Sequence, residues 1–296
     1  MSRTLHSKSK AKNKMQTGYT QAKIQTLDVE GVRTAYRRVG VSEGTPILFL
    51  NHLAANMDGA DPKIIDGLAA HFPVITFDYQ GIGRSGGEAP LSVEQMASDA
   101  IAFVRGLGYS RVHLLGQSLG GFVAQAMLAQ APELFPSVIL AGTGPAGDLG
   151  IARVPRITYY DMLRGGLTRR DPRRYLFFPM TKEAQAKGEA FVKRTSGYVD
   201  ADKPTQLKTL RRQLRAVVCW SKSPAQDFSG VTQRVWVVNG DNDRMVPTSG
   251  SYDMAHRLPN ATLTIYEGAG HGAIFQEVDR FVQQAVAFYK ANDINQ

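Results

Sequence analysis

Two serines lie in Gly-x-Ser-x-Gly segments, the pattern that holds a nucleophile on a sharp turn between a strand and a helix. Ser118 lies in Gly116–Gly120, and Ser85 lies in Gly83–Gly87. An apolar run precedes Ser118 and a run with helical periodicity follows it. Ser85 is followed by Glu-Ala-Pro, without an immediate helix. The neighbouring segments therefore favour Ser118 as the nucleophile.

The glycines around Ser118 have a steric explanation. A nucleophile on such a turn has a strained backbone, and side chains two positions away would collide there. Gly116 and Gly120 remove those side chains. The turn also places Ser118 at a helix amino terminus, where free N–H groups and the helix dipole favour negative charge. We therefore expect the amide of Leu119 to bind an oxyanion, although a serine here could also serve only as a helix cap.

A serine hydroxyl attacks a carbonyl only with the help of a general base within hydrogen-bond reach. Among the six histidines, His271 lies in a glycine-rich loop, Gly268–Gly272, which follows the last predicted strand. The base in turn needs a carboxylate that orients its ring. Asp241 and Asp243 both follow the preceding predicted strand, so the residues leave two candidates for this acid.

In these motifs and in their order along the chain, residues 24–290 resemble the α/β-hydrolase family. In that family the catalytic histidine follows the final strand, and the acid commonly lies a few residues before a Val-Pro or Leu-Pro step. The resemblance implies that Ser118, His271 and Asp243 form the catalytic triad. Asp241 would then be a turn or capping residue.

The resemblance also implies a second oxyanion donor, in the loop after an early strand. Asn51 and His52 occupy the positions of the family's His-Gly pair, and Leu53 would supply the amide. His52 places an imidazole where the family usually has no side chain. The ring could line the site, or it could turn outward and form local hydrogen bonds. We expect His52, Gln117 and Met245 to be the residues that line the substrate site.

Short apolar runs alternate with helical patterns along most of the chain. The expected strands cover residues 22–27, 32–39, 47–50, 74–77, 111–116, 137–142, 234–240 and 262–266. The expected helices cover residues 63–71, 93–107, 119–130, 249–258 and 278–290. This alternation predicts an α/β fold with a doubly wound, mostly parallel sheet.

Residues 147–230 interrupt the alternation, because they contain no convincing buried strand. A loop of that length without structure is improbable, so we expect an inserted helical cap over the site. Residues 24–146 and 231–296 would form the hydrolase core. The apolar residues of the cap are expected mostly to pack together and partly to line an apolar pocket. They include Tyr159, Tyr160, Met162, Leu163, Phe177, Phe178, Met180 and Trp220.

The net charge of +9 is unevenly distributed, since residues 1–23 and the central segment are basic and the remainder is acidic. We expect residues 1–23 to form a disordered basic tail. No nucleic-acid recognition motif accompanies the charge, so nucleic-acid binding is not expected. No apolar run approaches the ~20 residues of a membrane span. A single cysteine, Cys219, and the lack of an apolar secretory segment favour a cytoplasmic location.

The segment Gly81–Gly86 matches Gly-x-Gly-x-x-Gly, the fingerprint of dinucleotide-binding folds. The helix that should follow it begins only near Ser92, and no acidic residue stands at the next strand end. Residues 78–85 instead resemble the Asp-x-Arg-Gly-x-Gly-x-Ser turn of α/β-hydrolases, with Gln80 in place of the usual arginine, so no cofactor is expected. No cluster of histidines or cysteines predicts a metal site.

The resemblance implies a serine hydrolase that cleaves a carboxylic ester or lactone of a small, largely apolar substrate. The same triad also supports carbon–carbon bond hydrolysis, acyl transfer and perhydrolysis in relatives, and the fold does not choose among them. Ser118 argues against a haloalkane dehalogenase, whose nucleophile in this family is an aspartate. An alternative of another class is a non-catalytic sensor of a small molecule.

Overall fold

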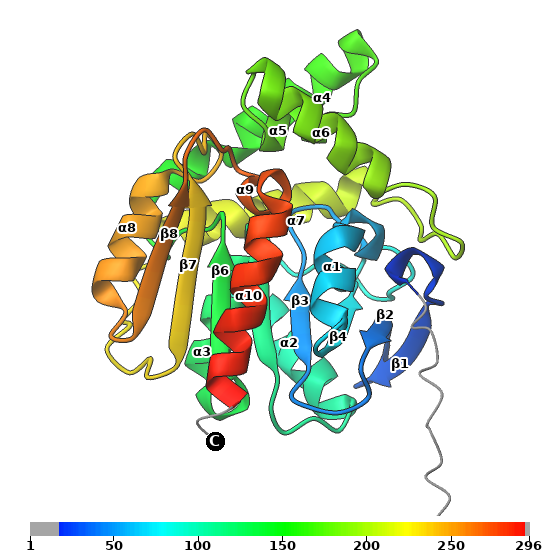
Figure 1. The fold of residues 1–296 in the computed structure, drawn as a ribbon, viewed down its shortest axis with the longest axis vertical. Helices are drawn as coiled ribbons and strands as arrows, with labels where there is room; N and C mark the ends of the chain where they lie inside the picture. The colour runs from blue at the N-terminus through cyan, green and yellow to red at the C-terminus, as the bar shows by residue number, and fades with distance from the viewer. Residues whose placement is uncertain (1–17, 294–296) are drawn as a thin grey trace, which may run out of the picture.

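The computed structural model describes residues 18–293, which form a central sheet covered by helices on both faces (Figure 1). The eight strands are ordered β1-β2-β4-β3-β5-β6-β7-β8, and only the pairs β1–β2 and β2–β4 are antiparallel. The predicted doubly wound, mostly parallel sheet is therefore confirmed. The strands are β1 (Gln25–Val29), β2 (Val32–Gly40), β3 (Ile47–Leu50), β4 (Pro73–Phe77), β5 (His113–Gln117), β6 (Ser137–Ala141), β7 (Arg234–Gly240) and β8 (Ala261–Tyr266).

Alternation of side chains along the buried strands divides the core into two layers. In β3, Leu48 and Leu50 face one layer, whereas Ile47 and Phe49 face the other. The first layer is covered by α2 (Val93–Gly106), α3 (Leu119–Gln130) and α8 (Thr248–Arg257). The second is covered by α1 (Pro62–Ala69) and α10 (Val278–Asp293). Apolar side chains on both faces of a strand are typical of a parallel sheet buried between helices.

The segment between β6 and β7 is helical, in the interval where a cap is expected. It contains α4 (Val154–Thr168), α5 (Arg173–Phe177), α6 (Lys182–Arg194) and α7 (Leu207–Lys222). Figure 1 shows α4, α5 and α6 beyond the end of the sheet at which the parallel strands terminate. The shorter elements are the 3₁₀ turns η1 (Tyr19–Gln21), η2 (Met57–Gly59), η3 (Pro132–Leu134) and η4 (Leu149–Arg153), and the helix α9 (Ala273–Gln276).

Ion pairs tie these helices to the core. Arg194 of α6 forms a pair with the buried Asp61 at the start of α1, with 2.6 Å between nitrogen and oxygen. Asp161 of α4 is also buried and pairs with Arg244, which follows β7. Loss of the arginine from either buried carboxylate would strongly destabilise the folded state, so these two ion pairs hold α6 and α4 against the core. Within residues 18–293, no helix combines the length and the apolar character that crossing a membrane would require.

The expectation of a disordered tail up to residue 23 is wrong for residues 18–23. Tyr19 is fully buried, and its backbone N–H donates to Asp66 over 2.7 Å. Its hydroxyl donates to the Met57 carbonyl over 2.8 Å and lies 2.9 Å from the Thr76 hydroxyl. Burial raises the pKa of Tyr19, which keeps the hydroxyl protonated. Burial of the Tyr19 side chain thus orders this segment in spite of its polar composition. Residues 1–17 lie outside the described part of the chain.

We expect Tyr19→Phe to lower the free energy of unfolding by about 1–3 kcal/mol, because two buried partners lose a hydrogen bond. Urea denaturation of the purified chain measures this. Tyr36→Phe is the matched control: its hydroxyl contacts only Gln25, at the surface, and the expected loss is below about 0.5 kcal/mol. Equal midpoints for the two variants would contradict a structural role for the Tyr19 hydroxyl.

Candidate active site

Ser118 occupies the sharp turn between β5 and α3, as its motif predicts. Its φ is 54° and its ψ is −116°, a conformation that residues with side chains rarely adopt. Such backbone strain costs about 1–3 kcal/mol and is found mainly where function requires it. A Cβ atom at Gly116 would lie 2.5 Å from the carbonyl oxygen of Gly120, and one at Gly120 would overlap the carbonyl of Leu50. Only glycine fits at these two positions.

Neighbouring strands hold the strained turn in place. The N–H of Ser118 donates to the carbonyl of Ala141, at the end of β6, over 2.9 Å. The hydroxyl of Thr143 donates to the Ser118 carbonyl over 3.0 Å. Ser85, in the other Gly-x-Ser-x-Gly segment, has a structural role: its hydroxyl donates to the Asp78 carbonyl and accepts from the Ala35 N–H.

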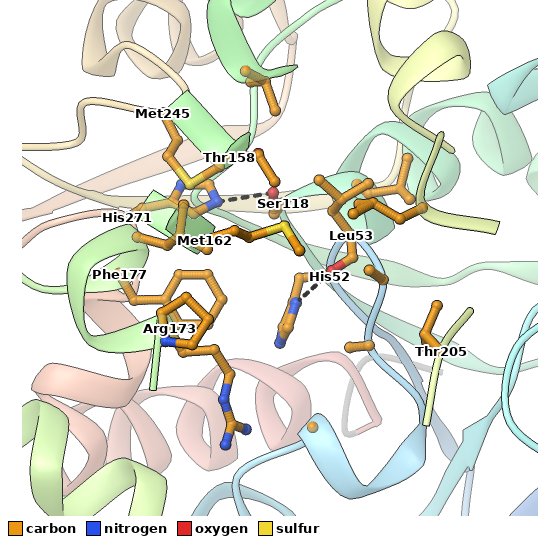
Figure 2. Close-up of a pocket in the computed structure, with 18 of the residues that line it drawn as sticks. His52, Leu53, Ser118, Thr158, Met162, Arg173, Phe177, Thr205, Met245 and His271 are labelled. Atoms are coloured by element: carbon orange, nitrogen blue, oxygen red, sulfur yellow. Dashed lines mark hydrogen bonds between the residues drawn. The ribbon is translucent and has the colours of Figure 1, made fainter. Parts of the chain in front are cut away.

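The structure brings Ser118, His271 and Asp243 into one hydrogen-bonded line. Nε2 of His271 lies 2.9 Å from Oγ of Ser118, and Nδ1 lies 2.8 Å from Oδ2 of Asp243 (Figure 2). All three residues are buried. A neutral imidazole whose Nδ1–H donates to the carboxylate leaves Nε2 free to accept the serine proton. This is the geometry of nucleophile, base and orienting acid.

Asp243, and not Asp241, is the carboxylate beside His271. Its other oxygen, Oδ1, accepts the backbone N–H groups of Met245 and Val246 over 2.8 and 2.9 Å. These bonds fix the carboxylate in the orientation that reaches the imidazole. Asp241 is exposed, and its carboxylate accepts from the side chain of Asn242.

Leu53 and Leu119 lie on the same cavity as Ser118. The amide of Leu119 is the first of α3, where backbone N–H groups lack partners within the helix. The amide of Leu53 forms no hydrogen bond within residues 18–293. Both N–H groups are thus available beside Ser118.

Gln213 contributes to the site, although the sequence did not predict it as a site residue. It is fully buried in α7, and its Oε1 accepts the backbone N–H of Ala54 over 2.7 Å. Ala54 follows Leu53 directly and has a φ of 57°, in the left-handed region. The hydrogen bond therefore holds a strained residue next to a candidate oxyanion donor. No local pattern could have shown it, because the two residues are 159 positions apart.

The ring of His52 is buried in the cavity wall and does not turn outward, although it also forms a local hydrogen bond. Nδ1 lies 3.1 Å from the carbonyl oxygen of Leu53, and the ring packs edge-on against Phe177 at 4.8 Å between centroids. Burial lowers the pKa of His52 to about 3. His52 is therefore a neutral part of the cavity wall.

Met245 lines the cavity as expected, but Gln117 does not appear among the lining residues. Gln117 is fully buried at the end of β5, and its Nε2 donates to the backbone carbonyl of His271 over 3.2 Å. This hydrogen bond directs the Gln117 side chain toward the loop that carries His271 and away from the cavity. Gln117 therefore helps to hold the backbone of His271 in place, on the side away from the cavity.

The cavity has a volume of about 510 Å³ and is formed jointly by the core and the inserted helices. Among the described residues, Arg173 is the one arginine in the cavity wall, and it pairs with both oxygens of Asp171 at 2.7–3.1 Å. Among the residues described, no three histidine, cysteine or acidic side chains are arranged to hold a metal ion. The apolar part of the wall is the larger: Leu53, Ala54, Ala55, Leu119, Phe122, Val154, Met162, Pro172, Leu176, Phe177, Pro204, Leu207, Leu210, Val217 and Met245.

Comparisons with known proteins agree with this fold. A family model described as the alpha/beta hydrolase fold matches residues 45–278. An alpha/beta hydrolase fold protein from Chitinophaga pinensis superposes with a TM-score of 0.87 at 30% identity, over 92% of this chain and 99% of that one.

Two curated relatives are each 27% identical to this chain. One is the dihydrolipoyllysine-residue acetyltransferase component of the acetoin cleaving system of Cupriavidus necator, with 88% of this chain and 67% of the relative covered. The other is a poly(3-hydroxyalkanoate) depolymerase of Ectopseudomonas oleovorans, with 83% and 84% covered. With the match to the family model over most of its length, the chain belongs to the alpha/beta hydrolase fold family.

Proposed function

We propose that this protein is a serine hydrolase that cleaves a carboxylic ester or lactone of a small, largely apolar molecule. The observation that carries the proposal is the hydrogen-bonded line of Ser118, His271 and Asp243 at an apolar cavity. A helix-capping serine would not require a strained backbone, a buried imidazole at 2.9 Å and a carboxylate behind it. These three features together are those of an activated nucleophile.

In the proposed reaction, Oγ of Ser118 attacks the carbonyl carbon and its proton passes to Nε2 of His271. Asp243 orients the imidazole and stabilises its protonated form. The amides of Leu53 and Leu119 bind the oxyanion of the tetrahedral intermediate. His271 then protonates the leaving alcohol, and a water molecule, deprotonated by His271, releases the acyl group from Ser118.

The size and composition of the cavity support a small apolar substrate. Its volume of about 510 Å³ lies within the range of pockets that bind small molecules. The relative named as a depolymerase acts on a polyester, which favours an acyl–oxygen bond. The relative named as an acetyltransferase component favours acyl transfer as the second candidate, since the same acyl-enzyme could react with an acceptor other than water.

We expect Ser118→Ala to lower kcat for p-nitrophenyl esters by about 10⁵-fold or more and to abolish labelling by a fluorophosphonate. Ser85→Ala, in the other Gly-x-Ser-x-Gly segment, is the matched control and should keep both properties. Stoichiometric labelling of Ser118→Ala would refute the assignment of the nucleophile. A panel of p-nitrophenyl esters, lactones and β-diketones, with product analysis, then identifies the bond that is cleaved.

We expect Gln213→Leu to lower kcat about tenfold or more with a smaller change in KM, because the loop carrying the Leu53 amide loses its anchor. Gln213→Glu keeps an acceptor oxygen at the same reach and should retain more of kcat. Steady-state kinetics with one p-nitrophenyl ester measures both variants. A change confined to thermal stability, with kcat intact, would show that Gln213 does not position the oxyanion loop.

The neutral state of His52 gives a prediction for pH. Its pKa in the folded protein, about 3, lies below the ordinary value of 6.5, so unfolding takes up a proton below pH 6.5. Its contribution to stability is therefore complete above pH 6.5 and is lost as pH falls toward 3. We expect the unfolding free energy of the wild type to fall more steeply below pH 6.5 than that of His52→Phe, by up to about 1.4 kcal/mol per pH unit. Parallel curves from urea denaturation would contradict this.

A further inference from the structure

One face of α4 is exposed and apolar, although the apolar residues of this segment were expected mostly to pack together. Tyr160, Leu163 and Leu167 are 62%, 64% and 78% exposed. Their spacing of three and four residues places them on one side of the helix. A contiguous apolar face of this kind is unusual on a soluble surface and commonly marks a contact with a partner. We call this face, together with the half-exposed Tyr159, the outer face of α4.

Positive charge is concentrated along α4 and at its two ends. Five arginines lie in residues 149–170, and none of them forms an ion pair within the described residues: Arg153, Arg156, Arg164, Arg169 and Arg170. The only carboxylate in this interval is Asp161, which is buried and already paired with Arg244. Arg164 stacks on the ring of Tyr175, at 4.2 Å from its centroid, and the other four arginines are exposed. Apolar side chains flanked by arginines without carboxylate partners are the composition of a helix that lies in the surface of an anionic membrane.

The opposite face of α4 belongs to the cavity. Val154, Thr158 and Met162, four residues apart, line the space above Ser118. Figure 2 shows Thr158 and Met162 beside the nucleophile, and Figure 1 shows α4 at the end of the molecule farthest from the lower edge of the sheet. Because α4 is the wall between the cavity and the outside, whatever covers its outer face lies next to the substrate site.

We propose that the outer face of α4 docks on the surface of an anionic lipid bilayer. Tyr160, Leu163 and Leu167 would enter the boundary between headgroups and acyl chains, and the arginines would contact lipid phosphates. Each arginine near such a surface strengthens binding about fivefold. The protein would bind reversibly from one side, with the cavity held close to the lipid.

Charge argues against a second copy of this chain as the occupant. Two outer faces brought together by twofold symmetry would place five arginines against five, with no exposed carboxylate between them in residues 149–170. Like charges at an interface oppose association. An anionic lipid surface supplies both the negative charge and the apolar phase that this face lacks.

The test is co-sedimentation of the full-length chain with vesicles of phosphatidylcholine alone and of phosphatidylcholine with phosphatidylglycerol. We expect at least about tenfold tighter binding to the anionic vesicles, and loss of that binding at high salt. The double variant Leu163→Glu/Leu167→Glu should bind the anionic vesicles at least about tenfold more weakly than the wild type.

The control variant is Val199→Glu/Tyr252→Glu, which places the same two charges at exposed apolar residues elsewhere and should bind as the wild type does. Both variants should hydrolyse a soluble p-nitrophenyl ester at the wild-type rate, so the proposed reaction is tested separately from docking. Equal vesicle binding by the two double variants would overturn the proposal, as would a wild type that does not bind. A dimer that Leu163→Glu/Leu167→Glu converts to a monomer, without vesicle binding, would instead assign the face to self-association.

Discussion

The close approach of three backbone segments at Ser118 is the constraint on which the rest of the structure depends. Gly120 lies directly against the carbonyl of Leu50, and Gly116 lies against the first turn of α3. This contact brings β3, β5 and α3 together at one point and forces Ser118 into its strained conformation. Burial of both faces of the central strands supplies the free energy that maintains this strain, so the geometry at Ser118 depends on the packing of the core.

The inserted helices complete the site as well as covering it. The carbonyl of Phe177, at the end of α5, accepts the N–H of Gly272 over 2.8 Å, directly beside His271. Gln213 of α7 holds Ala54 on the opposite side of the cavity. Both loops that flank Ser118 are thus fixed by residues of the insertion. One helix of that insertion, α4, lines the cavity on one side and presents an apolar and basic face to the outside.

The sequence by itself determined the order of the elements and the chemical groups of the site. The apolar runs predicted β3, β7 and α3 with the bounds that the structure has, because strand and helix periodicity are local properties. Two serines with the same Gly-x-Ser-x-Gly pattern could be separated by the flanking segments, since Ser118 lies between a strand and a helix and Ser85 does not. Position after the last strand likewise selected His271 among six histidines.

The tertiary structure alone decided which side chains reach the cavity and which support it. Gln117 adjoins the nucleophile in sequence, but its side chain points to the back of the histidine loop. Tyr19 looked like part of a polar tail and is buried in the core. Gln213 and the exposed face of α4 carried no local signal, since each depends on which side of a helix faces the interior of the protein. Burial and long-range hydrogen bonds arise from segments distant in sequence, and composition and periodicity do not encode those partners.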